Sequence, residues 1–221
     1  SLGDGVSLEP GACLVAFAAD GTPQRTVALD GSASTPAPVA DSARVGARLF
    51  VVEGESFDAG AQEDRLGLRM FSLPALEQAQ LVISSGAVVS LGAESLLNVH
   101  DQLWLFATIE GTDYEQHIQE VKLDGVTILD RPESTVFGTS GEKASFRLRF
   151  DEEGSLLDAT WWTMEIPAYA VGSDLLARRD RSAELMLSCA SDGSCAPFVW
   201  PADASLDRTI IPGSAISTYW T

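Results

Sequence analysis

The sequence predicts an all-β protein: an antiparallel, hairpin-rich domain, propeller-like or sandwich-like, with at most one or two short helices. Two observations lead to this class. Short apolar runs, several with the alternation of a half-buried strand, recur along the chain, and turn-forming pairs of an acidic residue and glycine separate many of them. Of the 221 residues, 45% are hydrophobic and 21% are charged, which is the composition of a globular chain with a sizeable core.

The clearest hairpin spans residues 145–164. In residues 145–150, large apolar side chains alternate with serine and arginine, so one face is apolar and the other polar. Asp151–Gly154 then supplies a turn, and Leu156–Met164 supplies a second strand that carries Trp161 and Trp162. This segment predicts two paired strands.

Acidic-Gly pairs mark the other turns, because glycine adopts the positive φ of tight hairpins and aspartate tolerates the position before it. Eight such pairs occur: Asp4-Gly5, Asp20-Gly21, Asp30-Gly31, Glu53-Gly54, Glu110-Gly111, Asp124-Gly125, Glu153-Gly154 and Asp192-Gly193.

The chain is expected to form a single β-rich domain over residues 1–221, with a loop or linker at residues 30–41, where Ser, Ala and Pro are abundant. Strand-loop-strand units begin near residues 14, 48, 103, 145 and 185. Their spacing suits propeller blades and sandwich hairpins alike. Ser173–Asp180 has a serine cap and is expected to form two turns of helix, and Leu76–Val82 fits a helical turn or a strand.

The chain is strongly acidic, with 32 acidic and 14 basic residues and a net charge of −18. Such a surface repels phosphate backbones and anionic lipid heads, so nucleic-acid and membrane-surface binding are not expected. No apolar run is long enough for a membrane-spanning helix. Arginine outnumbers lysine, and Asn98 is the only asparagine, a bias that GC-rich bacterial coding produces.

Cysteine spacing predicts a disulfide and an exported protein. Cys189 and Cys195 flank a short turn, and strands on either side would bring them within disulfide distance. Free thiols and a zinc pair are the alternatives, but zinc needs two more soft ligands, and only Cys13, His100 and His117 are available. A disulfide implies a periplasmic, secreted or cell-surface location.

The acidic segment 53–64 is the best metal candidate. Hard cations such as Ca²⁺ are bound by several oxygens on a flexible loop with glycine. The segment lacks the regular spacing of a dedicated calcium loop, and a solvated loop explains it as well. Its carboxylates are Glu53, Glu55, Asp58, Glu63 and Asp64.

Trp161, Trp162 and Glu165 are the candidate ligand-binding residues. Neighbours in a strand point to opposite faces, so one tryptophan is expected in the core and the other toward solvent. An exposed tryptophan stacks on a sugar or anchors a protein partner, and a carboxylate beside it is one of the two acids that glycoside hydrolysis needs. Packing beneath a loop is the alternative.

No motif predicts catalytic residues. A nucleophile elbow, a phosphate-binding loop and a dinucleotide fingerprint are all missing from the sequence. We therefore expect an exported bacterial β-domain that acts as a non-enzymatic binding or structural subunit of a larger assembly, with a protein partner. The alternative is a carbohydrate-binding or glycoside-cleaving β-domain, stabilised by calcium or free of cofactor.

Overall fold

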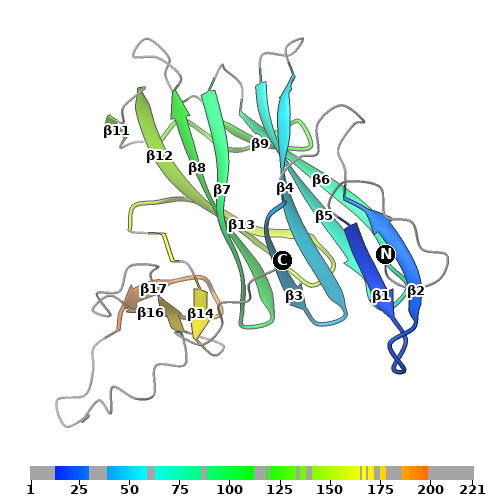
Figure 1. Cartoon of the computed structure of the whole chain (residues 1–221). Coiled ribbons are helices and arrows are strands. Elements are labelled where there is room, and N and C mark those ends of the chain that lie inside the picture. The colour runs from blue at the N-terminus through cyan, green and yellow to red at the C-terminus, as the bar shows by residue number, and fades with distance from the viewer. Residues whose placement is uncertain are drawn as a thin grey trace, which may run out of the picture.

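The computed structural model describes most of the chain between residues 13 and 198. The described residues are 13–29, 39–58, 63–85, 89–111, 118, 120–132, 135–137, 141–164, 166–167, 169–171, 175–177 and 186–198. They form four antiparallel sheets (Figure 1). Among these residues no helix is long and apolar enough to cross a membrane.

The two largest sheets lie face to face. The six-stranded sheet has the order β10 (Val126–Leu129), β9 (Val121–Leu123), β6 (Glu77–Ser85), β5 (Glu63–Ser72), β4 (Arg48–Asp58) and β3 (Val39–Val45). The five-stranded sheet has the order β11 (Val136–Phe137), β12 (Glu142–Phe150), β8 (Gln102–Gly111) and β7 (Val89–Val99), and β13 (Leu156–Trp162) also pairs with β12. Both contribute alternate side chains to one core, which includes Phe50, Leu68, Leu105, Phe146 and Phe150.

Each large sheet is also apolar on its outer face, and a smaller sheet covers it. The hairpin of β1 (Cys13–Phe17) and β2 (Pro23–Ala28) packs on Val51 and Phe71 of the six-stranded sheet. A four-stranded sheet packs on Trp104 and Phe106 of the five-stranded sheet. Its order is β14 (Tyr169–Val171), β15 (Leu175–Ala177), β16 (Met186–Cys189) and β17 (Cys195–Pro197). The chain thus stacks four β-layers.

One five-residue loop recurs in three hairpins: Ala18–Thr22, Asp151–Ser155 and Ala190–Ser194. In each loop the first and fifth residues share a backbone hydrogen bond, and the N–H of the glycine in fourth position donates to the first carbonyl. That glycine has a φ between 83° and 91°, and an aspartate side chain accepts the N–H of the fifth residue. This is the type I turn with a glycine bulge.

Two other hairpins use two-residue turns with positive φ at both positions. Asp124-Gly125 joins β9 to β10, with φ of 48° and 79°. His100-Asp101 joins β7 to β8 without a glycine, at 52° and 56°. The second turn therefore holds two L-residues in the left-handed region, where each costs about 1 kcal/mol or more.

Aspartate side chains from the six-stranded sheet cap the edge strand β7. Asp64 Oδ2 accepts the backbone N–H of Leu91 at 3.2 Å, and Asp41 Oδ2 accepts that of Leu96 at 2.8 Å. An edge strand with free N–H groups is open to pairing with another chain. These two contacts tie β7 to the opposite sheet instead.

The structure confirms the all-β, hairpin-rich class and is sandwich-like, not propeller-like. Propeller blades are separate sheets around an axis, whereas here the predicted units contribute strands to two sheets with a common core. The helix expected at Ser173–Asp180 is wrong at Leu175–Ala177, which pair with β16 as β15. Tertiary pairing outweighs the local cap signal there.

Three boundaries also differ from the expectations. Of the segment 76–82, residues 77–82 are strand, since β6 begins at Glu77. The expected loop at 30–41 ends early, because β3 begins at Val39, and residues 30–38 lie outside the described residues. Neither Glu53-Gly54 nor Glu110-Gly111 is a turn, since Gly54 pairs with Leu66 in the β4–β5 ladder and Gly111 pairs with Val89 in the β7–β8 ladder.

We expect Asp101→Gly to stabilise the protein by about 1 kcal/mol, because glycine adopts a φ of 56° without the penalty of a side chain. Asp20→Gly is the control and should destabilise, since Asp20 Oδ1 accepts the Thr22 N–H. Urea unfolding of both variants measures the difference. A destabilised Asp101→Gly variant would contradict the turn geometry.

Candidate functional site

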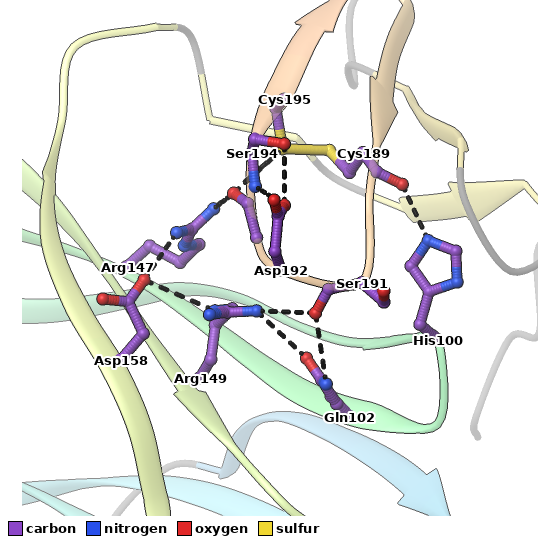
Figure 2. The surroundings of a disulfide bond; sticks show 11 residues. His100, Gln102, Arg147, Arg149, Asp158, Cys189, Ser191, Asp192, Ser194 and Cys195 are labelled. Atoms are coloured by element: carbon purple, nitrogen blue, oxygen red, sulfur yellow. Dashed lines mark hydrogen bonds and ion pairs between the residues drawn. A yellow bond between two sulfur atoms is a disulfide. The ribbon is translucent and has the colours of Figure 1, made fainter.

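The most concentrated polar chemistry lies between the five-stranded and four-stranded sheets. Strand β12 alternates as the sequence predicts, with Phe146, Leu148 and Phe150 in the core of the sandwich. Arg147 and Arg149 point to the opposite face, yet only 4% and 7% of their surfaces are exposed. They are buried because the β16–β17 hairpin lies over them (Figure 2).

The two arginines hold the loop of that hairpin by its backbone. Arg147 Nη1 donates to the carbonyl oxygen of Gly193 at 2.6 Å, and Arg149 Nη1 donates to that of Ser191 at 3.0 Å. Gln102 Nε2 also donates to the Ser191 carbonyl, at 3.4 Å. Since carbonyl oxygens are the acceptors, the contact recognises the shape of the turn and not its side chains.

One carboxylate serves both guanidinium groups. Arg147 Nη2 donates to Asp158 Oδ2 at 2.9 Å, and Arg149 Nε lies 3.4 Å from the same oxygen (Figure 2). Burial lowers the pKa of Arg147, and the hydrogen bond and charge of Asp158 oppose this change. The second positive charge also depresses the pKa of Arg147, because Arg149 repels it.

The faces of aromatic rings form the rest of the surroundings of the two guanidinium groups. The Arg147 Cζ atom lies 4.5 Å from the ring centroid of Trp104 and 5.3 Å from that of Trp162, and Arg149 Cζ lies 5.8 Å from Trp104. Trp162 also meets Phe106 edge to face at 5.0 Å. Such contacts favour a desolvated cation by about 2 kcal/mol. We call Arg147, Arg149, Asp158, Trp104 and Trp162 the arginine cluster.

The predicted disulfide is present and closes the hairpin that the cluster holds. Cys189 and Cys195 are directly opposed in the β16–β17 ladder, with Cα atoms 4.1 Å apart. His100 Nε2 hydrogen-bonds to the Cys189 carbonyl oxygen at 2.7 Å, from the turn between β7 and β8 (Figure 2). The turn at His100 thus contacts the disulfide hairpin.

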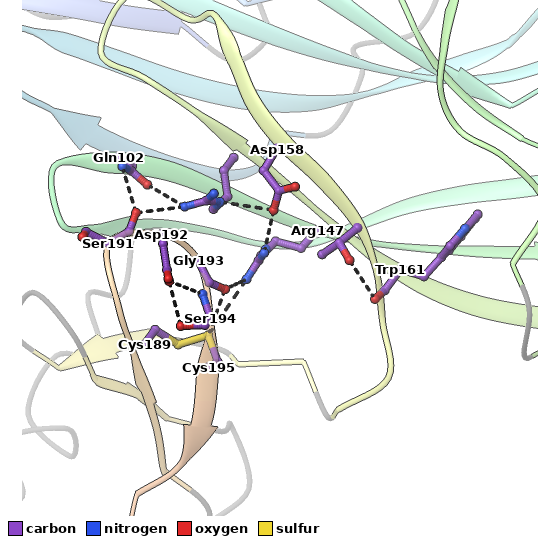
Figure 3. Close-up of polar contacts among 12 residues, drawn as sticks. Gln102, Arg147, Asp158, Trp161, Cys189, Ser191, Asp192, Gly193, Ser194 and Cys195 are labelled. Atoms are coloured by element: carbon purple, nitrogen blue, oxygen red, sulfur yellow. Dashed lines mark hydrogen bonds and ion pairs between the residues drawn. A yellow bond between two sulfur atoms is a disulfide. The ribbon is translucent and has the colours of Figure 1, made fainter.

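The two candidate tryptophans lie on opposite faces of β13. Trp162 is buried in the arginine cluster, 7% exposed. Trp161 is half-buried against the main core, where it packs edge to face on Phe146 and donates from Nε1 to the Asp130 carbonyl at 2.8 Å. Figure 3 shows Trp161 apart from Arg147 and Asp158. Glu165, the third candidate, lies outside the described residues.

Two carboxylates of the predicted metal segment point to different faces of the six-stranded sheet. Glu53 Oε2 pairs with Arg69 Nε at 2.9 Å on the outer face, while Asp64 contacts β7 on the inner side. Glu55, Asp58 and Glu63 belong to β4 and β5, but their side chains lie outside the described residues. In the part of the chain that the structure describes, no three potential ligands gather. Calcium at this segment stays a prediction.

Of the arginine cluster, only Trp162 was among the sequence candidates. The sequence feature that could have indicated the cluster is the pair Arg147 and Arg149 on the polar face of a clearly alternating strand. Trp104 and Trp162 lie elsewhere in the sequence. Chemically, the donors of the cluster bind carbonyl oxygens and one carboxylate, and its rings cover the cations. This arrangement docks one sheet on another.

We expect Gly193→Ala to destabilise the protein more than Gly21→Ala, although both glycines occupy the same place in the recurring loop. A Cβ atom at Gly193 would lie 2.4 Å from Arg149 Cζ, whereas one at Gly21 would meet nothing within 4 Å. Both variants carry the strain of positive φ, and only Gly193→Ala adds a clash of about 1–3 kcal/mol. Equal losses in urea unfolding would contradict the docking contact.

We expect Asp192 to titrate below its ordinary pKa of 3.8, because the Ser194 N–H and hydroxyl donate to it and Arg149 attracts it. A lowered folded-state pKa stabilises the fold above pH 3.8, and this contribution is lost as the pH falls through the folded pKa. Arg149→Gln should raise the pKa of Asp192 and leave that of Asp20, which Thr22 lowers in the same way, unchanged. Carboxyl NMR titration measures both. Equal shifts at the two aspartates would contradict the role given to Arg149.

In comparisons with known proteins, no family model matches the chain, and neither a curated protein nor a solved structure matches it significantly. What the chain does is therefore inferred from its own residues.

Proposed function

We propose that this protein is a non-enzymatic structural or binding subunit of a bacterial assembly outside the cytoplasm. The arrangement of the arginine cluster supports this function. Buried arginines and aromatic rings are frequent at reactive sites, but here they bind Gly193, Ser191 and Asp158 and thereby hold two layers together. The disulfide supports a periplasmic, secreted or cell-surface location.

The surface that would meet a neighbouring subunit is the edge formed by β10, β11 and β13. Most of the large hydrophobic side chains exposed in the described residues lie on these three strands: Val126 is 67% exposed, Val136 65% and Leu157 47%. Strands β11 and β13 pair with the same side of β12, and β13 approaches β10. Exposed apolar residues on edge strands favour association.

The occupant that we assign to this edge is a second copy of the chain. Edge strands pair through their backbones, and Val126 and Leu157 would bury apolar surface in such a contact. Each copy carries a net charge of −18, so the contact forms against mutual repulsion. Association through this edge should therefore strengthen as salt screens the charges.

We expect the wild-type chain to self-associate at micromolar concentration in 0.5 M NaCl, and Val126→Lys/Leu157→Lys to be monomeric, because charged lysines oppose edge pairing. Phe17→Lys is the matched control, since Phe17 is 51% exposed on β1, outside this edge, and should behave as wild type. Sedimentation velocity at several salt concentrations measures the association.

A wild-type monomer at all salt concentrations, or equal loss in the Phe17→Lys control, would exclude this edge as the contact. The carbohydrate alternative gives a different result. Glycan binding that Trp161→Ala abolishes, in a chain that stays monomeric, would replace the proposed function by sugar recognition.

A further inference from the structure

The disulfide lies against one of the two arginines that hold its hairpin. Arg147 Nη1 is 4.0 Å from Cys195 Sγ and donates at the same time to the Gly193 carbonyl at 2.6 Å. Cys195 is half-buried, whereas Cys189 is only 2% exposed. Cys195 is thus the more exposed of the two cysteines, and its sulfur lies close to a buried cation.

We propose that the Cys189–Cys195 bond is a redox-sensitive latch: a dithiol reductant opens it, and Arg147 then holds Cys195 as a thiolate and binds the carbonyl of Gly193 less strongly. The proposal concerns the four-stranded sheet and is independent of the assembly edge.

The reaction is a two-electron exchange. A thiolate of the dithiol attacks Sγ of Cys195, the more exposed of the two cysteines, the S–S bond breaks, and Cys189 leaves as a thiolate that takes up a proton. The second thiol of the reductant then attacks its own sulfur in the mixed disulfide. A cyclic disulfide forms, and Cys195 leaves beside Arg147. The dithiol is oxidised and the protein disulfide is reduced.

The charge balance favours Cys195 as the thiolate. Among the described residues of the oxidised protein, the two guanidinium groups share a single ion-pair partner, the Asp158 carboxylate. A thiolate at Cys195 adds a second negative charge close to Arg147, in a site where screening by water is weak. Thiolates beside arginine have pKa values below the ordinary 8.5.

Other charged groups lie around the same hairpin, and their effects are distinct. Arg149 favours the thiolate, while Asp158 and Asp192 oppose it. His100 bonds to the Cys189 carbonyl from the β7–β8 turn. Arg147 contacts Cys195 Sγ directly. Its removal should therefore have the largest effect on the pKa of the Cys195 thiol.

Opening the bond weakens the docking in two ways. The cross-link between β16 and β17 is lost, and Arg147 Nη1, which already reaches both groups, is drawn toward the thiolate and holds the Gly193 carbonyl less strongly. The loop Ala190–Ser194 then keeps the contact from Arg149 and Gln102 to Ser191. Reduction is therefore expected to loosen the hairpin while the core of the sandwich stays folded.

The first test measures alkylation of each cysteine in the reduced, full-length chain with iodoacetamide against pH, by mass spectrometry of peptides. We expect the midpoint for Cys195 in the wild type to lie about one pH unit or more below that in Arg147→Gln, because Arg147 stabilises the thiolate. Arg131→Gln is the control, because Arg131 is 60% exposed and pairs with Glu142, and it should not shift the midpoint. Asp158→Asn, which removes the competing carboxylate, should lower it further.

The second test compares hydrogen exchange of the oxidised and reduced wild-type chain. Peptides from residues 186–198 should lose at least tenfold in protection on reduction, and peptides from β4, β5 and β8 should not change. A Cys195 midpoint that neither Arg147→Gln nor Asp158→Asn moves overturns the thiolate assignment. Unchanged protection at 186–198, or equal loss in every strand, overturns the latch.

Discussion

The architecture depends on one constraint, which is that strand β8 is apolar on both faces. Leu103, Leu105 and Ala107 face the six-stranded sheet, and Trp104 and Phe106 face the other way. A two-layer sandwich buries only one of these faces and would leave two large aromatic rings in water. The four-stranded sheet is the cover that they require. The six-stranded sheet also has apolar residues on its outer face, Val51 and Phe71, and the β1–β2 hairpin covers them.

The burial of charge follows from that cover. Arg147 and Arg149 sit on the strand next to β8 and on the same face as its aromatic residues, so a sheet that covers the rings also covers the arginines. Burying a cation without partners is costly. Carbonyls of the disulfide loop, the shared Asp158 and the ring faces meet this cost together. The arginine cluster, although its composition resembles that of a reactive site, is thus explained by the packing of the two sheets.

Much of the acidity also has a structural role in the described residues. Asp20, Asp151 and Asp192 accept backbone N–H groups within the recurring loop, and Asp41 and Asp64 cap an edge strand. Proximity of acid to glycine in the sequence predicts the first role, because both belong to one turn. The second role joins residues of different sheets and is not visible in local sequence.

The hairpin at 145–164 and the disulfide were predictable because each is set by neighbours in the chain. Strand β7 was missed for a physical reason: a bulge between Ala93 and Ser95 shifts its alternation, so Leu91 and Leu96 share the core face although their numbers differ by five. The burial of Arg147 and Arg149 beside Trp162 was missed because the sheet that covers them consists of strands of three or four residues, which are too short to show a periodic pattern.

Docking through main-chain carbonyls has a consequence for how this interface can change over evolutionary time. The oxygen atoms of Ser191 and Gly193 are present whatever side chains the loop carries, provided that a glycine keeps the turn. Substitutions at Ser191 would accumulate without loss of the contact, whereas the arginines opposite cannot drift. In an interface of this kind, the side chains of the loop are free to vary among related sequences, whereas the arginines that bind its carbonyl groups are retained.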